Sequence, residues 1–239
     1  MMSAPLQSLR TLQTLQSLRI AIVGAESTGK TTLAAALAAA LALATGLRVA
    51  WVPELLRGWC DHVGRTPLAH EQGAILRAQH ERIEAAASTH DVVVCDTTAL
   101  MTAVYSRYVF NDRSLEARAA ALHSKMALTL LTALDLPWVP DGLQRDGPQA
   151  RDAVDTLLRE LLMQHRLPWC LVAGVGEARV QAALDAAAPL LRPRTAPRSG
   201  LFTRLDERNA EPAARSWRCD HCDDAACEHA LRKTRTNGV

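Results

Sequence analysis

The sequence predicts an α/β fold, a five-stranded parallel sheet with helices on both faces, and three observations lead to this class. Short apolar runs alternate along the chain with longer segments that carry leucine and alanine at helical spacing. The apolar runs are continuous, as expected of strands that are buried on both faces of a sheet. Apolar residues make up 49% of the 239 residues, which is enough to form the core of one such domain.

Clear strand and helix signals occupy the first hundred residues. "LRIAIVG" (18–24) is rich in β-branched residues and ends in glycine, which predicts a strand. Residues 30–45 repeat leucine and alanine at helical spacing up to a glycine, a typical helix stop. "LRVAWVPE" (47–54) and "DVVVCDT" (91–97) predict two further buried strands, and the amphipathic residues 67–88 predict a helix between them.

The same alternation continues until the composition changes near residue 193. The further helices expected are 98–108, 114–127, 149–164 and 177–191, and the further strands are 128–135 and 168–175. Beyond Pro193 the chain is rich in arginine, proline and polar residues without a sustained period, which favours a linker. The predicted organisation is a flexible N-terminal extension over 1–18, the α/β domain over 19–192, a linker over 193–216 and a Cys/His-rich tail over 217–239.

A glycine-rich motif joins the first predicted strand to the first helix. "GAESTGKT" fits the phosphate-binding pattern G-x-x-x-x-G-K-[ST] in full and has the expected strand before it and helix after it. Backbone N–H groups of such a loop point at phosphate oxygens, and Lys30 would reach the β- and γ-phosphates. The residues predicted to bind ATP are Gly24, Glu26, Ser27, Thr28, Gly29, Lys30, Thr31 and Thr32.

A Mg²⁺ ion is expected beside these phosphates. The Thr31 hydroxyl would supply one ligand. Asp96 would supply a second, because it ends a strand at the carboxyl edge of the sheet, where open α/β folds bind their ligands. The alternative is that Asp96 only caps the following helix, a role for which Thr97 and Thr98 compete.

Three classes of protein use such a loop, and the rest of the sequence favours one of them. A GTPase would carry an Asn/Thr-Lys-x-Asp guanine motif, but lysine occurs only at positions 30, 125 and 233, and the later two lack that context. A motor or oligomeric ATPase usually has a larger core and an arginine finger for its neighbour. A small-molecule kinase needs an acceptor site and a basic lid, and this chain has candidates for both.

The acceptor site is expected at the end of the second strand. Glu54 would take or orient the proton of the acceptor hydroxyl, and Arg57 would bind substrate or phosphate. The alternative is a surface Glu/Arg pair one helical turn apart.

The lid candidate is "DLPWVPDGLQRDGPQAR" (135–151), whose prolines and glycines favour a defined loop. Arg145 and Arg151 would meet the charge of the transferring phosphoryl group. Trp138 either stacks on a base-like ring or serves as a core or hinge residue, and Asp141 would hydrogen-bond a ribose or an amide.

The order and spacing of four segments resemble the kinase domain of NadR-type ribosylnicotinamide kinases, within a wider group of P-loop ATPases. The segments are "GAESTGKTT", "VPELLR", "VVVCDTTALMTAVYSRYVF" and "LDLPWVPDGLQRDGP", and the resemblance covers about residues 19–190. It implies a P-loop NTPase fold and ATP-dependent phosphorylation of the ribose 5′-hydroxyl of nicotinamide riboside. Other family members fuse the kinase to an adenylyltransferase domain, whereas this chain is expected to supply only the kinase step.

One position departs from the family pattern Asp-Gly-Leu-Arg. Here Gln144 follows Asp141-Gly-Leu and Arg145 comes one residue later, so the lid arginine is displaced or replaced by glutamine. Relatives in the wider group are described as nucleotide-binding regulators. The second hypothesis is therefore an ATP-binding regulatory protein without riboside kinase activity, whose tail senses metal or redox state.

The tail segment "WRCDHCDDAACEHALRK" (217–233) concentrates metal-binding side chains. Three thiolates and an imidazole within eleven residues suit tetrahedral Zn²⁺ in a structural or regulatory site. The candidate ligands are Cys219, Cys222, Cys227 and His229. The alternatives are a redox-sensitive thiol cluster or a disordered tail with incidental cysteines.

Charge and cysteine usage bound the partners and the compartment. The net charge of +2 argues against general nucleic-acid binding, and no apolar run reaches membrane-spanning length. Cys60, Cys95 and Cys170 are scattered, which is typical of reduced, buried thiols in a cytoplasmic protein. The expected partner is a small nucleoside substrate, and the sequence does not predict the oligomeric state.

Overall fold

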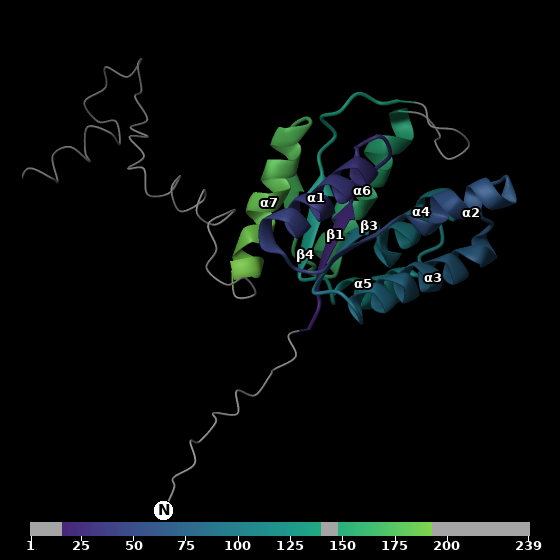
Figure 1. Cartoon of the computed structure of the whole chain (residues 1–239). Helices are drawn as coiled ribbons and strands as arrows, with labels where there is room; N and C mark the ends of the chain where they lie inside the picture. The colour runs from purple at the N-terminus through teal and green to yellow at the C-terminus, as the bar shows by residue number, and fades with distance from the viewer. Residues whose placement is uncertain (1–15, 140–147, 193–239) are drawn as a thin grey trace, which may run out of the picture. The chain divides into compact units, whose positions relative to one another are not determined.

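The computed structural model describes residues 16–139 and 148–192 and confirms the predicted P-loop α/β fold class (Figure 1). Its strands are β1 (Leu18–Val23), β2 (Val49–Val52), β3 (Val92–Asp96), β4 (Leu128–Thr132) and β5 (Cys170–Val172). Its helices are α1 (Lys30–Thr45), α2 (Leu55–Val63), α3 (Ala69–Ala87), α4 (Ala99–Phe110), α5 (Glu116–His123), α6 (Pro148–Gln164) and α7 (Glu177–Leu191).

All neighbouring strands are parallel, and the sheet order is β2-β3-β1-β4-β5. The most N-terminal strand therefore lies in the middle of the sheet, with β3 on one side and β4 on the other. The register pairs Ile22 with Asp96 and Val23 with Leu131. The connection that follows β1 leads to the β2 side of the sheet, whereas the connection that follows β3 leads to the β4 side. The loop after β1 therefore opens into the crevice where α/β sheets bind ligands.

Helices cover both faces of the sheet, as Figure 1 shows. α1 packs against β2, β3 and α7, and α7 also contacts β5. On the other face, Ala21 and Val23 of β1 share a buried cluster with apolar side chains of α4 and α6. Because successive strand residues point to opposite faces, the fully buried side chains of Ile20 and Ile22 lie on the face that α1 covers.

The structure corrects the predicted second strand and adds a helix that the sequence did not indicate. β2 ends at Val52 rather than at residue 54, because Pro53 has no N–H to donate to the ladder. Glu54 is the N-cap of α2, a helix of nine residues. This helix contains Gly58, and its weak intrinsic helix propensity explains why the sequence did not predict it. The candidate base thus lies at a strand-to-helix turn.

Other differences are smaller. β4 and β5 end three residues before the predicted strands do. Cys60 and Cys95 are buried free cysteines, but Cys170 is exposed because β5 is an edge strand, so the prediction of a buried thiol is wrong there. Within the described ranges, no helix is both long and apolar enough to cross a membrane. The predicted extension, linker and Cys/His-rich tail lie outside the described residues, apart from the last residues of the extension.

Candidate active site

The phosphate loop connects β1 to α1 and depends on two glycines. Gly24 has φ of 154°, and a Cβ there would clash with the Thr132 hydroxyl at the end of β4. Gly29 has φ of 73° and caps α1, and a Cβ there would lie 2.9 Å from Leu136 Cδ1. These conformations and close approaches require glycine, so the spacing of the motif follows from the shape of the loop.

Hydrogen bonds hold the loop from within. The Thr28 hydroxyl donates to the carbonyl of Ala25 at 2.8 Å and accepts from the Thr132 hydroxyl at 2.7 Å. Lys30 Nζ donates to the same Ala25 carbonyl at 2.7 Å. Because Ala25 belongs to the loop itself, this contact keeps the ammonium group folded over the loop, where phosphate oxygens are expected.

A buried arginine that the sequence analysis missed supports the loop from the β4–β5 side. Arg179 in the first turn of α7 is 4% exposed and donates to the carbonyl of Thr28 at 2.9 Å. It also donates to Asp135 Oδ1 at 2.7 Å and to the Gly174 carbonyl at 2.8 Å. Asp135 in turn accepts from the Gly174 amide at 2.6 Å. One side chain therefore joins the phosphate loop to the segments that follow β4 and β5.

The described part of the lid candidate lies against the same loop. The Ser27 hydroxyl donates to the Val139 carbonyl at 2.8 Å. Arg151 is buried on α6 and donates to the Leu136 carbonyl at 2.7 Å, so its guanidinium holds residues 133–139. Trp138 is half-buried, and its Nε1 has no hydrogen-bond partner among the described residues.

Three further lid residues, Asp141, Gln144 and Arg145, lie outside the described residues, as do Cys219, Cys222, Cys227 and His229 of the tail. Their predicted roles stay predictions. Among residues 16–139 and 148–192, no group of three or more His, Cys, Asp or Glu is arranged to hold a metal ion.

Asp96 lies at the carboxyl end of β3 and is 1% exposed. Both of its carboxylate oxygens are buried. Neither makes a hydrogen bond of good geometry within the described residues, although the Thr31 hydroxyl and the Glu54 amide lie close to them. Burial raises the pKa of Asp96, and the neighbouring Thr31 hydroxyl and Lys30 ammonium oppose this rise. Thr97, the next residue, has φ of 66°, a strained conformation for a β-branched residue and one that often marks a functional site.

Glu54 faces the same space from the start of α2. Burial raises its pKa above the ordinary range, Lys30 opposes that effect, and the nearby Asp96 carboxylate adds to it. Arg57, one turn later on α2, also opposes the rise. Glu54 and Asp96 therefore share one electrostatic environment with Lys30, although Glu54 lies at the N-cap of α2 rather than at a strand end.

Two cavities meet at these charged residues. The first, of about 650 Å³ including its open part, is lined by Ser27 to Thr32 of the loop together with Glu54 and Arg57. The second, of about 880 Å³ including its open part, is lined by Glu26, Lys30, Glu54 and Arg57 at one end. Lys30, Glu54 and Arg57 line both, so a group bound in one cavity faces a group bound in the other.

Aromatic residues that the sequence analysis did not assign line the second cavity. Its wall includes Tyr105, Tyr108 and Phe110 of α4. The chain contains only two tyrosines and two phenylalanines, so three of these four rings gather at one pocket. The signal available in the sequence was this concentration of rings at helical spacing in a chain with 4% aromatic residues.

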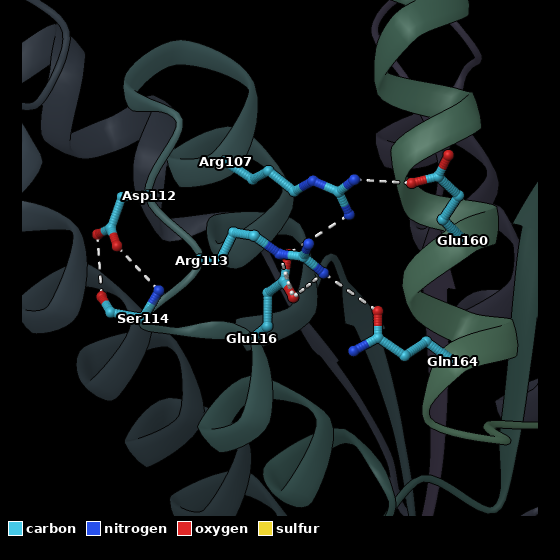
Figure 2. A network of polar contacts seen from close by, with 7 residues as sticks. All are labelled: Arg107, Asp112, Arg113, Ser114, Glu116, Glu160 and Gln164. Carbon is cyan, nitrogen blue, oxygen red and sulfur yellow. Dashed lines mark hydrogen bonds and ion pairs between the residues drawn. The ribbon is translucent and has the colours of Figure 1, made fainter.

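A network of charged residues anchors the C-terminal end of α4 (Figure 2). Glu116 of α5 accepts from Arg113 at 3.1 Å and from Arg107 at 3.5 Å. Arg107 also donates to Glu160 of α6 at 2.8 Å, and Arg113 to Gln164 at 3.3 Å. The network joins α4, α5 and α6 and thereby fixes the helix that carries the aromatic wall.

Comparisons with known proteins show which domains resemble this fold. A family model described as an AAA domain matches residues 19–179. Among solved structures, a NadR protein in complex with NR is 19% identical with a TM-score of 0.57, and one in complex with NAD and AMP-PNP is 17% identical with a TM-score of 0.55. Each comparison covers 72% of this chain and 50% of the NadR chain, so this chain spans about half the length of those proteins.

A thymidylate kinase from Ehrlichia chaffeensis is 15% identical with a TM-score of 0.51, and the match covers 73% of this chain and 99% of that one. No curated protein matches the sequence. At these identities the likeness shows the fold, and at that level the predicted resemblance to the NadR kinase domain is confirmed.

Proposed function

This chain belongs to the AAA domain family, and from that premise we propose that it transfers the γ-phosphoryl group of ATP to the ribose 5′-hydroxyl of nicotinamide riboside. The observation that carries the proposal is the pair of cavities that share Lys30, Glu54 and Arg57. A triphosphate on the loop and a nucleoside in the aromatic-lined pocket would meet at these residues. Phosphoryl transfer depends mainly on such positioning and on charge stabilisation.

Each charged residue has a distinct role in the proposed transfer. The acceptor oxygen forms a bond to the γ-phosphorus while the bond from that phosphorus to the oxygen of ADP breaks. Glu54 takes the proton of the acceptor hydroxyl, and its raised pKa suits a group that must hold a proton after the transfer. Lys30 and Arg57 offset the negative charge on the phosphoryl oxygens.

Mg²⁺ is the metal that the proposed reaction requires, and the residues present fit it. Asp96 offers two buried carboxylate oxygens that make no hydrogen bond of good geometry in the described residues, and the Thr31 hydroxyl lies close to them. Hard oxygen ligands of this kind suit Mg²⁺, which usually keeps several waters. When bound, such an ion would neutralise part of the phosphate charge. Asp96 and Thr31 would hold it, directly or through water.

The acceptor pocket favours an unphosphorylated nucleoside with a planar ring. Tyr105, Tyr108 and Phe110 offer apolar ring faces on which a planar base packs well. At the phosphate end, the carboxylates of Glu26 and Glu54 would repel an acceptor that already carries a phosphate, and they can accept hydrogen bonds from ribose hydroxyls.

A coupled assay with purified chain, ATP and Mg²⁺ tests the proposal on nicotinamide riboside, nicotinic acid riboside, thymidine and thymidylate. We expect ADP formation that requires nicotinamide riboside and yields nicotinamide mononucleotide. A preference for thymidylate would show that nicotinamide riboside is not the acceptor. Tight ATP binding without phosphorylation of any compound would favour the alternative, a nucleotide-binding regulatory protein.

A further inference from the structure

Gln72 is a buried polar residue of the acceptor pocket that the proposed transfer does not use. It lies in the first turn of α3, is 3% exposed and lines the pocket with the aromatic residues of α4. Its Oε1 is buried and has no hydrogen-bond partner among the described residues. Buried polar atoms are rarely left unpaired, since each costs about 1–3 kcal/mol, so this oxygen is available to accept a hydrogen bond from a bound ligand or a water.

A second buried glutamine on the same helix, Gln79, makes hydrogen bonds to the protein and serves as a comparison. Gln79 is 2% exposed, accepts from the Leu55 amide at 2.8 Å and donates to the Pro53 carbonyl at 3.4 Å. It therefore holds the turn that carries Glu54. Gln72 lies seven residues earlier, two turns or about 10 Å along the same face of the helix. The two glutamines share a face and burial, but the Gln72 Oε1, unlike that of Gln79, has no hydrogen-bond partner among the described residues.

This spacing places Gln72 at the end of the pocket away from the phosphates. Gln79 marks the end at Glu54, where the acceptor hydroxyl would react. A separation of about 10 Å is the scale of a nucleoside, so an acceptor with its 5′-oxygen at Glu54 presents its base near Gln72. Tyr105 and Tyr108 line the same pocket, and their rings would pack against the faces of such a base.

We infer that Gln72 is the residue that recognises the head group of the acceptor, and that this head group is a planar ring bearing a carboxamide. The Oε1 atom accepts a hydrogen bond from the carboxamide N–H, which supplies the partner that the protein lacks. This inference rests on the proposed function and assigns Gln72 a role in specificity rather than in the transfer itself.

A comparison of two acceptors and two variants tests this role. The acceptors are nicotinamide riboside and ribosylpyridinium, which has the same ring without the carboxamide. Gln72→Leu should raise KM for nicotinamide riboside about three- to tenfold, with kcat little changed, because one neutral hydrogen bond is lost. KM for ribosylpyridinium should not change. Gln79→Leu is the matched control and should lower kcat for both acceptors, because it loosens the turn that carries Glu54.

The outcomes separate failure of the inference from failure of the proposed function. Equal effects of Gln72→Leu on both acceptors, or no effect on either, would overturn the role of Gln72 while riboside phosphorylation stands. A wild-type chain that phosphorylates no riboside would overturn both. Thermal unfolding checks the fold: Gln72→Leu should be at least as stable as wild type, because it removes a buried unpaired oxygen.

Discussion

The two sides of the phosphate loop differ in how their buried polar atoms are paired. On the β4–β5 side, the Thr28 and Thr132 hydroxyls and the terminal nitrogens of Arg179 all make hydrogen bonds. On the β2–β3 side, Asp96, Glu26 and Gln72 each have a buried oxygen without a partner among the described residues. The first side is thus mostly paired within the chain, with Arg179 Nε and two nitrogens of Arg151 as exceptions, whereas the second offers unpaired acceptor oxygens to a ligand.

This difference predicts opposite costs for substitutions on the two sides. Removing a side chain on the β4–β5 side breaks hydrogen bonds that already exist, so it should lower stability. Removing an unpaired group on the β2–β3 side should leave stability unchanged or raise it, while activity falls. Natural proteins commonly trade stability for function in this way.

The largest expected effect is that of Glu54→Gln on turnover. Loss of the base should lower kcat by about 10²- to 10⁴-fold, the range typical of general base catalysis. ATP affinity should stay near that of the wild type, because the phosphate loop is otherwise intact. Steady-state kinetics and ATP titration measure the two quantities. Unchanged turnover would show that Glu54 does not act as the base, and it would contradict the proposal that activity depends on the β2–β3 side of the loop.

A pH titration of stability probes a buried, paired group that contacts both Thr98 after β3 and Thr129 of β4. His123 is buried, and its ring nitrogens contact the Thr98 and Thr129 hydroxyls, each at 2.8 Å. Burial lowers its pKa from 6.5 to about 4. Between these values the unfolded chain binds a proton that the folded chain does not, so the free energy of unfolding falls as pH drops through this window. The loss should be on the order of 3 kcal/mol and should level off below pH 4.

Chemical denaturation at several pH values measures this effect. His123→Gln keeps hydrogen-bonding capacity but cannot titrate, so its stability should depend less on pH between 6.5 and 4. An equal pH dependence in wild type and variant would show that another group is responsible.

Arg179→Ala is expected to lower stability through the paired side of the loop. The change removes hydrogen bonds to Thr28, Asp135 and Gly174, and it should cost about 2 kcal/mol of unfolding free energy. KM for ATP should rise as the loop loosens. Arg113→Ala is the control, since the Arg113 side chain is more than half exposed and its ion pair with Glu116 should contribute less to stability. Similar losses of unfolding free energy in both variants would show that the hydrogen bonds of Arg179 do not stabilise the β4–β5 side of the loop as proposed.

The sequence predicted the parts of the site that follow from local patterns. The loop motif, its strand and helix, and the strand-end position of Asp96 are fixed by residues close together in the chain. Gln72, the aromatic wall and Arg179 depend on tertiary contacts; Arg179 and Thr28, for example, are 151 residues apart. α2 escaped prediction because it is short, contains Gly58 and follows a proline. Local periodicity carries no signal for such contacts.

The smallest expected effect is also the one with the least intuitive sign. Burial raises the pKa of Asp96, so the folded chain holds its proton more tightly than the unfolded chain does. At pH 7 the ionised carboxylate therefore destabilises the fold, and Asp96→Asn should raise the unfolding free energy by about 1 kcal/mol without Mg²⁺ or nucleotide. Thermal unfolding measures this gain, while turnover should fall.

Asp112 provides a control for the direction of this change in stability. The Ser114 amide and hydroxyl lower the pKa of Asp112, so its carboxylate stabilises the fold and Asp112→Asn should lower the melting temperature. Two aspartate-to-asparagine changes in one chain should thus shift stability in opposite directions. If Asp96→Asn also lowered the melting temperature of the ligand-free chain, the contacts of the Asp96 carboxylate with the Thr31 hydroxyl and the Glu54 amide would outweigh the cost of its burial, and the proposed difference between the two sides of the loop would fail.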